Sequence, residues 1–509
     1  MRKTILYILL IAVFSAAQAS AGDVERGRAV YEKYCWWCHG EDGSGDGPAF
    51  EFLNPPPRDF TFGLYKWKST PFDEYAPSGE DLRGMIIGGL TEERVPGWDG
   101  LNGTSMPGWS DVLNDREIED VIEYIKSLAM LQAPVKEPVD LSGRVRPTEE
   151  GMERGGELFR DRCSECHGEL GRGDGQKKLK DDYGDRTWPR NLTKHWTFRA
   201  GRSPEDIYTR VTAGVHFTQM PSFADPESIK KLTENERWDI ANYVSTLNEP
   251  YKKPGDDAVI KARRMEGEVP SGPEDAAWEE VEYKSFYMVP QIMAGERLFK
   301  PSIDSISVKA VYNDRELALL IEWDDHTGSV PGDKESEEIA GGEVFRDAVA
   351  VEFPSSPTGD GQKPYFGMGS PTRPVNIWFW QGGTAEEPQG LEIINARGIE
   401  DMEKREAEGA GFSAEGYYDR GTWRVVIKRP LLAGEEGKDI QFKEGVFIPI
   451  AFAAWDGSNG DTGSRHVMTA WQSLVLETGS SPGVYAWSAA AALVVLVLEL
   501  LWLGSVRRR

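Results

Sequence analysis

Residues 35–39 of the chain read CWWCH, and residues 163–167 repeat the pattern as CSECH. In each stretch two cysteines stand three positions apart, and a histidine follows at once. Covalent haem attachment requires this spacing, because each thiol forms a thioether to one vinyl group and the histidine takes the proximal face of the iron. The two stretches therefore predict two c haems, attached at Cys35, Cys38, Cys163 and Cys166.

These four cysteines are the whole cysteine content of the 509 residues. No thiol remains for a disulfide, an iron–sulfur cluster or a cysteine-based zinc site. A redox dithiol or half of a zinc site is the alternative use of an isolated C-x-x-C pair. The histidine that follows both pairs favours haem over these alternatives.

The residues around the first pair predict a small all-α domain over 22–132. Apolar residues at helical spacing predict a helix over Val24–Tyr34 that leads into Cys35, and an amphipathic closing helix over Asp115–Leu128. Between them lie glycine-rich turns, a run of three prolines and a short helix over 80–87.

Met106 stands in the sequence SMPGW, where proline and glycine prevent a helix. A linker rich in proline and charge over 133–147 leads to a second domain over 148–248. There the same order recurs, with a helix at 150–162, C-x-x-C-H, a glycine-rich turn, Met220-Pro221 and a closing helix at 233–247. This element-by-element recurrence predicts a tandem of two domains of one kind.

The order of helix, C-x-x-C-H, irregular wrap, Met-Pro loop and closing helix resembles class I cytochrome c over the whole of each domain. The resemblance implies that His39 and Met106 ligate the first iron, and that His167 and Met220 ligate the second. A thioether opposite an imidazole raises the haem potential and fills both axial positions, which favours electron transfer over substrate chemistry.

The ligand assignments have alternatives. Met106 and Met220 can instead be core residues, the usual role of methionine. His216 lies close to Met220 in the sequence and is a second candidate ligand, although the Met-Pro context favours Met220. His195 has no comparable context, and we interpret it as a pocket or surface residue.

Beyond a second linker over 249–273, the hydrophobic period changes from helical to alternating. Residues 305–312 and 317–323 predict a β-hairpin around Asn313-Asp314, and further strands are expected at 347–353, 375–380, 423–428 and 446–455. Such strands are expected to form an antiparallel β-sandwich over 274–478.

Several motifs in this part are similar to the haem b (gamma) subunit of ethylbenzene dehydrogenase, among them EWDD at 322–325, PVNIWFW at 374–380 and AWDGSNG at 454–460. Related gamma subunits serve other molybdenum enzymes of the DMSO reductase family, including chlorate and selenate reductases and nitrite oxidoreductase. The resemblance implies a non-covalent haem b held between a methionine and a lysine.

Met368 matches the methionine position of that family, whereas the lysine position reads His466 in this chain. Imidazole is a common haem ligand and needs no deprotonation of an ammonium group, so we expect Met368 and His466 to ligate a haem b. His326 and Met468 are the fallback ligands. The alternative is a haem-free sandwich that acts as a docking or sensor module.

Both ends of the chain predict export and membrane anchoring. Residues 1–21 combine a basic start, an apolar core and a small-residue cleavage site, as in a secretory signal peptide. Residues 484–503 supply the roughly 20 apolar residues that a membrane span needs, and three arginines follow at 507–509. These features predict a single-pass protein of the cytoplasmic membrane with its haem domains in the periplasm and its C-terminus in the cytoplasm.

The net charge of −26 argues against a nucleic-acid partner, because phosphate binding needs basic patches. We therefore expect a membrane-anchored multihaem cytochrome that is no enzyme on its own. By resemblance, its partners are an oxidoreductase with molybdenum and iron–sulfur subunits on one side and respiratory electron carriers on the other. The chain transfers electrons between these two partners. A dihaem peroxidase is a further alternative, but it needs an open distal position, and two Met-Pro loops speak against one.

Overall fold

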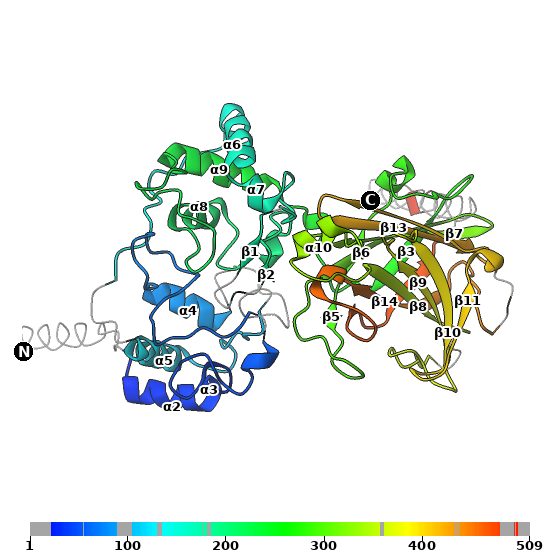
Figure 1. The fold of residues 1–509 in the computed structure, drawn as a ribbon, viewed down its shortest axis with the longest axis horizontal. Coiled ribbons are helices and arrows are strands. Elements are labelled where there is room, and N and C mark those ends of the chain that lie inside the picture. The colour runs from blue at the N-terminus through cyan, green and yellow to red at the C-terminus, as the bar shows by residue number, and fades with distance from the viewer. Residues whose placement is uncertain are drawn as a thin grey trace, which may run out of the picture.

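The computed structural model describes residues 22–53, 55–88, 104–129, 135–175, 177–180, 184, 186–356, 361–432, 435, 437–478, 493 and 495–496. A helical N-terminal part and a large β-sheet domain lie side by side (Figure 1), which confirms the predicted order of fold classes. The predicted signal peptide, 1–21, lies outside the described residues, as does almost all of the predicted span, 484–503. Among the described residues, no helix has both the length and the apolar character needed to cross a membrane.

The first lobe, residues 22–129, is built on two crossing helices that match the predicted ranges, α2 (Val24–Tyr34) and α5 (Asp115–Leu128). Asp23 caps α2 through the Arg26 amide, and Asn114 starts α5 with a capping box. Ile118, Val121, Ile122 and Ile125 of α5 are buried in the core of the lobe. The remaining helices are α3 (Trp36–His39), the 3-10 turn η1 (Phe50–Phe52) and α4 (Gly79–Ile87).

The second lobe, residues 135–252, repeats this arrangement above the first lobe in Figure 1. Its helix α6 crosses α9 as α2 crosses α5. Both crossings carry the same ion pair at 2.7 Å, between Arg26 and Asp120 in the first lobe and between Arg154 and Asp239 in the second. The elements are α6 (Glu149–Arg162), α7 (Ser164–His167), β1 (Leu179–Lys180), β2 (Arg186–Thr187), η2 (His195–Thr197), α8 (Pro204–Ala213), α9 (Glu234–Thr246) and η3 (Pro250–Lys252).

Glycine makes both helix crossings possible. A Cβ atom on Gly27 would lie 1.9 Å from the carbonyl oxygen of Asp120, and one on Gly155 would lie 2.3 Å from that of Asp239. Real side chains do not tolerate such contacts, so only glycine lets the two helix backbones approach this closely. The internal repeat therefore extends from the motifs to individual backbone contacts.

The β domain, residues 259–478, is a sandwich made from one continuous path of strands, β11-β10-β9-β8-β14-β16-β3-β6-β7-β13-β12. Side chains from both halves of this path form the main core. The strands are β3 (Val259–Arg264), β4 (Lys284–Tyr287), β5 (Val289–Pro290), β6 (Ser305–Tyr312), β7 (Glu316–Asp324), β8 (Ala348–Pro354), β9 (Val375–Gln381), β10 (Gly390–Ala396), β11 (Met402–Glu406), β12 (Ser413–Asp419), β13 (Thr422–Pro430), β14 (Phe447–Trp455), β15 (Val467–Met468) and β16 (Gln472–Leu476).

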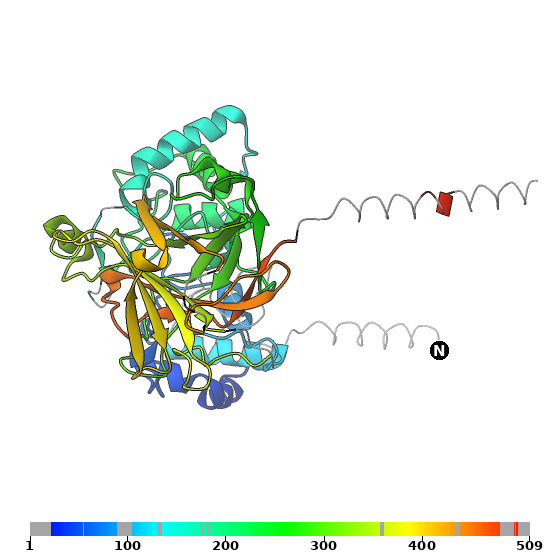
Figure 2. The same ribbon diagram turned by 90° about the vertical axis from the view of Figure 1, so that its right-hand side faces the viewer.

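The short helices of the domain are η4 (Ala276–Glu280), α10 (Lys334–Ala340), η5 (Glu408–Ala410) and η6 (Gly457–Asn459). Figure 2 looks at the molecule from the side of the β domain and shows its strands crossing in front of the two lobes. The predicted hairpin is confirmed as β6 and β7, which pair antiparallel from Ile306 and Trp323 to Tyr312 and Leu317.

Strand β3 corrects two expectations. It lies within 249–273, where the sequence predicted a linker, and it pairs parallel with both β16 and β6, so the sandwich is not wholly antiparallel. Its alternating pattern is short, with Ile260 and Ala262 buried and Lys261 and Arg263 exposed. Its partner β16 stands at the other end of the domain sequence. Such non-local pairing is set by the tertiary fold, so local periodicity could not reveal it.

Lys194 of the second lobe is 8% exposed and joins this lobe to the β domain. Its Nζ atom lies 2.7 Å from a carboxylate oxygen of Asp304 and 2.6 Å from one of Asp324. Burial lowers the pKa of this ammonium group, but the two carboxylates outweigh burial and hold the pKa above its usual value. The first lobe also touches the β domain, where the rings of Phe52 and Phe299 lie 5.1 Å apart.

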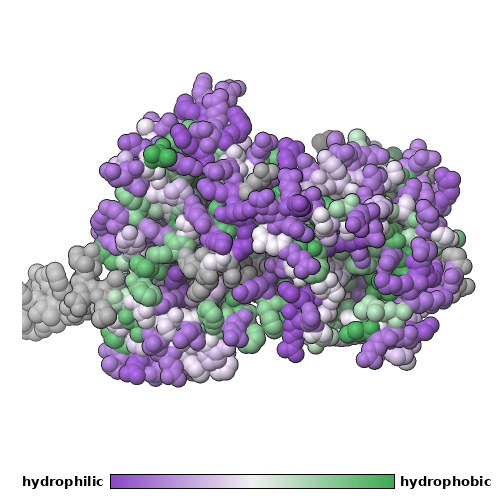
Figure 3. All heavy atoms as spheres, in the orientation of Figure 1, coloured by the Kyte–Doolittle hydropathy of each residue, from purple (hydrophilic) through white to green (hydrophobic). Residues whose placement is uncertain are grey.

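Most of the face shown in Figure 3 is hydrophilic, over both lobes and the β domain alike. This agrees with the strongly acidic composition of the chain. A charged outer surface keeps such a molecule soluble and leaves the apolar side chains to the cores.

Gly155→Val should destabilise the second lobe by about 1–3 kcal/mol, because α6 and α9 must move apart to admit the side chain. Thermal unfolding of the haem-loaded protein, followed by circular dichroism, measures the change. Gly255→Val is the matched control, because a Cβ atom there meets nothing within 4 Å. Equal melting temperatures for the two variants would contradict the close approach of α6 and α9 at Gly155.

Lys194→Met should cost about 1–3 kcal/mol, since it leaves Asp324 largely buried without its cation, while the half-exposed Asp304 loses less. A raised lysine pKa stabilises the fold at every pH below its unfolded value of about 10.4 and loses effect only above it. The stability gap between variant and wild type should therefore stay constant from about pH 6 to about pH 9. A stability difference that disappears within this pH range would show that Lys194 is not the charged partner of Asp304 and Asp324.

Candidate haem centres

Helix α2 delivers Cys35 to the first site, where the Cys35 amide donates to the Tyr31 carbonyl at 2.9 Å. His39, at the end of α3, places its Nδ1 atom 3.1 Å from the carbonyl oxygen of Arg58. Because a carbonyl only accepts, Nδ1 must carry the proton, and Nε2 is left with a free lone pair. Burial lowers the pKa of His39 and favours the neutral imidazole, the form that binds iron.

The second site repeats this geometry. His167 places its Nδ1 atom 3.1 Å from the carbonyl oxygen of Arg190, and burial again lowers its pKa. In both lobes the accepting arginine follows a proline, at Pro57 and Pro189. A backbone carbonyl that orients a metal-binding histidine is a common second contact at such sites, since it fixes the tautomer and the ring direction.

The two sites open into one cavity of about 710 Å³. Its wall contains every residue predicted for the two c haems: Cys35, Cys38, His39, Met106, Cys163, Cys166, His167 and Met220. Residues of the β domain complete the wall, among them Lys300, Asp304, Asp324, His326, Ser458 and Asn459. The structure thus brings together side chains that lie far apart in the sequence, with each methionine in the same cavity as its expected histidine.

The cysteines differ from those of a redox dithiol. Burial raises the pKa of Cys35 and of Cys163 to about 12, and burial also raises the pKa of Cys38 and Cys166. Reactive dithiols need the opposite, a lowered pKa that exposes a thiolate at neutral pH. The environment therefore favours haem attachment over thiol exchange.

The cavity wall is basic although the chain as a whole is acidic. Arg58, Lys66, Arg186, Arg190 and Arg199 all line it. Burial lowers the pKa of Arg199 to about 9 and also lowers that of Arg190 and Arg186. Among the described residues, the Nε and Nη2 atoms of Arg186 are buried with no hydrogen-bond partner. Buried guanidinium groups match the two propionates of a haem, so the donor set fits this group.

These basic residues belong to none of the motifs that predict the haem sites. One signal could have found two of them, because Pro57-Arg58 and Pro189-Arg190 recur at the same place in the two repeats. The others stand in different local contexts. Only the folded wall shows that they share a cavity.

The other histidines of the cytochrome lobes have structural contacts. His195 is buried, and its Nε2 atom lies 3.2 Å from the carbonyl oxygen of Val244. His216, the candidate competitor of Met220, lies at the contact between the lobes, where its ring centre is 5.2 Å from that of Tyr75. It is not part of the cavity wall that holds Met220.

His326, a fallback ligand for haem b, lies instead at the second c-haem site. Its Nδ1 atom is 3.0 Å from the carbonyl oxygen of Gly173, and its ring stacks on Trp188 with 4.9 Å between centres. Both partners belong to the second lobe. His326 therefore acts as a contact between the β domain and the second c-haem site.

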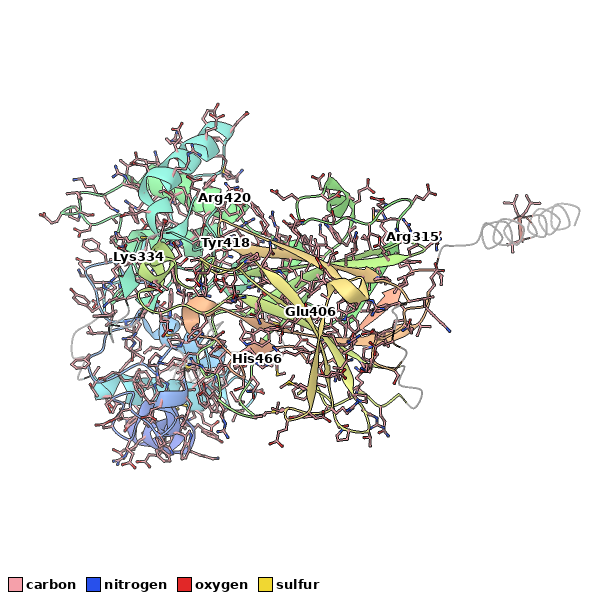
Figure 4. The ribbon with its side chains drawn as sticks, turned by 45° about the vertical axis from the view of Figure 1, so that its right-hand side comes forward. Arg315, Lys334, Glu406, Tyr418, Arg420 and His466 are labelled. Atoms are coloured by element: carbon pink, nitrogen blue, oxygen red, sulfur yellow. The ribbon has the colours of Figure 1, made fainter. Side chains whose placement is uncertain are left out.

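Met368 packs on an apolar cluster of strands β8, β9 and β10 that includes Ala350, Ile377 and Ile394. Trp455 packs on the same cluster, and its ring centre lies 4.7 Å from that of His466. His466 thus contacts a residue that packs on the same cluster as Met368. Figure 4 shows His466 on the segment that follows β14.

Two local features resemble a cofactor site. The Nδ1 atom of His466 lies 3.2 Å from the carbonyl oxygen of Gly463, the same arrangement as in the two c-haem sites. Met368 has a φ of 72°, a strained conformation for a residue other than glycine. The surrounding structure must hold such a conformation, and residues of this kind are frequent at functional sites. Met468, the second fallback ligand, is paired with Ala453 across β15 and β14 and is buried.

Comparison with known proteins adds family relationships. The cytochrome c family matches residues 24–129 and 152–248, and the ethylbenzene dehydrogenase family matches residues 274–392 and 392–467. A candidate respiratory nitrate reductase heme subunit, ORF7, of Haloferax mediterranei is 26% identical over 230 residues, which are 44% of this chain and 76% of that protein.

The chlorate reductase subunit gamma of Ideonella dechloratans is 29% identical over 171 residues, which are 33% of this chain. They cover 64% of that subunit, slightly less than two thirds of its length. Among solved structures, a chain of the Kuenenia stuttgartiensis reducing HAO-like protein complex Kustc0457/Kustc0458 is 34% identical. The match covers 45% of this chain and 98% of that one, with a TM-score of 0.39.

Met106→His and Met220→His should each lower the potential of one c haem by a part of the roughly 0.8 V range that axial ligands span. Imidazole stabilises ferric iron better than a thioether does. Redox titration in the visible range measures the shift, together with loss of the thioether-to-iron charge-transfer band. Met402→His, at an exposed position on β11, is the control. An unchanged potential would mean that the substituted methionine is no ligand.

Proposed function

Since two domains of the cytochrome c family precede a domain of the ethylbenzene dehydrogenase family in this chain, we propose that it is the electron-transfer subunit of a respiratory molybdenum oxidoreductase of the DMSO reductase family. It carries two c haems and one b haem. It passes electrons between the catalytic subunits of that oxidoreductase and respiratory carriers. Similar proteins named as nitrate and chlorate reductase subunits support this proposal.

One observation carries the proposal: both cysteine–histidine–methionine sets line a single cavity that the β domain helps to close. Bound haem supplies one-electron chemistry. His39 and Met106 in one lobe, and His167 and Met220 in the other, are available to fill the axial positions. With both positions filled there is no place for a substrate, which favours a carrier over a peroxidase.

The residues around the ligands support the same role. The carbonyls of Arg58 and Arg190 hold the Nδ1 protons of the two histidines, which keeps Nε2 available to iron. The basic side chains of the wall balance the propionates in a protein that is otherwise acidic. The apolar residues around them, such as Phe60 and Phe223, exclude water, and a dry site keeps the reorganisation that accompanies electron transfer small.

In the β domain, Met368 and Trp455 pack on the same apolar cluster, and the ring of Trp455 contacts that of His466, which supports a b haem there. The buried Glu352 belongs to the adjoining strand β8, and burial raises its pKa well above the usual value. Its Oε1 atom has no hydrogen-bond partner among the described residues. A neutral carboxyl at this position avoids placing a negative charge in the apolar surroundings.

The location of the protein is part of the proposal. The predicted signal peptide, 1–21, and the predicted span, 484–503, are its support, together with the arginines at 507–509. They give a single-pass protein of the cytoplasmic membrane with periplasmic haem domains. On this arrangement the fusion keeps the haem b domain and the c-haem lobes at a high effective concentration near each other.

A pyridine haemochrome spectrum of the detergent-purified full-length protein tests the haem content. Two c haems and one b haem are expected, and His466→Ala should lose the b haem while both c haems stay. His466→Lys restores the ligand type of the related subunits and should retain it. Met402→Ala, at an exposed position, should change nothing.

A wild-type protein with two c haems and no b haem would refute the three-haem assignment. It would favour the tethered dihaem cytochrome with a docking domain. A high-spin ferric signal from either c haem would favour the peroxidase.

A further inference from the structure

Three buried aspartates meet in the β domain, on the side of the second lobe. Asp325 follows β7, Asp347 precedes β8 and Asp456 follows β14. They are 2%, 0% and 1% exposed, and one carboxylate oxygen from each lies within 4.8 Å of the others. Within the described part of the chain, no lysine or arginine forms an ion pair with any of the three. Burying three carboxylates together without a cation is costly.

Hydrogen bonds hold these side chains in place and leave specific oxygens bare. Asp347 accepts from the amides of Gly457 at 2.7 Å and Ser329 at 2.6 Å, and from the Trp423 indole at 2.8 Å. The other two aspartates each use Oδ1 only. Asp325 accepts from the Thr327 amide at 3.1 Å, and Asp456 accepts from the amides of Ser458 at 2.8 Å and Asn459 at 3.1 Å.

The Oδ2 atoms of Asp325 and Asp456 are both buried and have no hydrogen-bond partner among the described residues. The indole N–H of Trp323 approaches Asp325 but lacks the geometry of a hydrogen bond. Buried polar atoms are nearly always paired, so two bare carboxylate oxygens in one cluster call for a further partner. A cation is the partner that also balances the charge.

The pKa shifts of these aspartates also indicate a missing positive charge. Burial and the nearby carboxylate of Asp456 raise the pKa of Asp347 to about 8, and burial and both neighbouring aspartates raise that of Asp325 well above its usual value. The nearby Asp461 follows the same trend, with its pKa raised to about 7 by burial and by Asp456. Without a cation the cluster favours bound protons. A divalent ion would instead stabilise the charged forms.

We propose that Asp325, Asp347 and Asp456 bind a Ca²⁺ ion. All the donors are oxygens, the set preferred by hard cations, and no imidazole or thiol is part of the cluster. Calcium accepts irregular sets of six to eight oxygens, whereas magnesium demands a near-ideal octahedron and keeps several waters. Three carboxylates fixed by backbone amides from separate loops suit the irregular coordination of calcium better than the octahedron of magnesium.

The ion would support the wall of the second c-haem site. Asp325 is followed by His326, whose Nδ1 donates to the Gly173 carbonyl, and the Gly173 amide in turn donates to the carbonyl of His167 at 2.9 Å. Ser458 and Asn459, which Asp456 holds, line the c-haem cavity directly. The cluster thus joins three loops of the β domain that face the second lobe.

Figure 4 shows where this contact lies. Tyr418 and Arg420 stand on the side of the β domain that meets the second lobe, and Arg315 and Glu406 stand away from it. The Tyr418 hydroxyl donates to the backbone carbonyl of Asp325 at 3.2 Å. Loss of the ion should therefore loosen the contact between the β domain and the second lobe as well as the cluster itself.

The test uses the full-length, haem-loaded protein in detergent. Elemental analysis after gel filtration in metal-free buffer should find one calcium per chain. Removal of the ion with a chelator should lower the melting temperature by several degrees. Added Ca²⁺ should restore it, and Mg²⁺ at the same concentration should not.

Asp325→Asn is the informative variant, because it keeps the shape and the Oδ1 acceptor but removes one charge. It should weaken Ca²⁺ binding at least tenfold in calorimetric titration and abolish the response to chelator. Glu406→Gln, at an exposed position on β11, is the control and should behave as the wild type.

Two results would overturn the proposal. One is a wild-type protein that holds no calcium and shows no change of melting temperature in excess Ca²⁺. The other is an Asp325→Asn variant that is more stable than the wild type with and without Ca²⁺, because relief of repulsion is what a metal-free carboxyl cluster predicts.

Discussion

Each cytochrome lobe depends on one hydrogen bond, from the Nδ1 atom of its C-x-x-C-H histidine to a backbone carbonyl. His39 and Arg58 form it in the first lobe, and His167 and Arg190 form it in the second, both at 3.1 Å. This bond sets the tautomer and leaves the Nε2 lone pair free to bind iron. The helix that carries the cysteines and the loop that carries the arginine must therefore keep a fixed separation. The glycine crossings at Gly27 and Gly155 hold the preceding helices, α2 and α6, against the closing helices, α5 and α9.

The acidic surface and the basic interior serve different needs. A net charge of −26 favours solubility, whereas each proposed haem would bring its own carboxylates into a buried site. Arginines and lysines are concentrated on the cavity wall, where burial makes their positive charges energetically costly. A haem propionate would offset part of that cost, so the basic wall fits the proposed c haems.

The β domain does more than extend the chain. Strand β3 joins the two halves of the sandwich by parallel pairs, and Lys194 joins the second lobe to the edge of β6 and β7. The carboxylate cluster lies behind the same contact, with His326 between it and Gly173. This side of the β domain forms part of the wall of the c-haem cavity.

The sequence by itself determined the local elements and the local chemistry: two C-x-x-C-H sites, helices at Val24–Tyr34 and Asp115–Leu128, and the β6–β7 hairpin. These depend on spacing within a few turns of chain, which a sequence displays directly. Tertiary structure alone decided the merging of the two sites, the parallel pairing of β3, the place of His326 and the meeting of three aspartates. Each of these joins residues that are distant along the chain, and no local pattern records which distant segments will pack together.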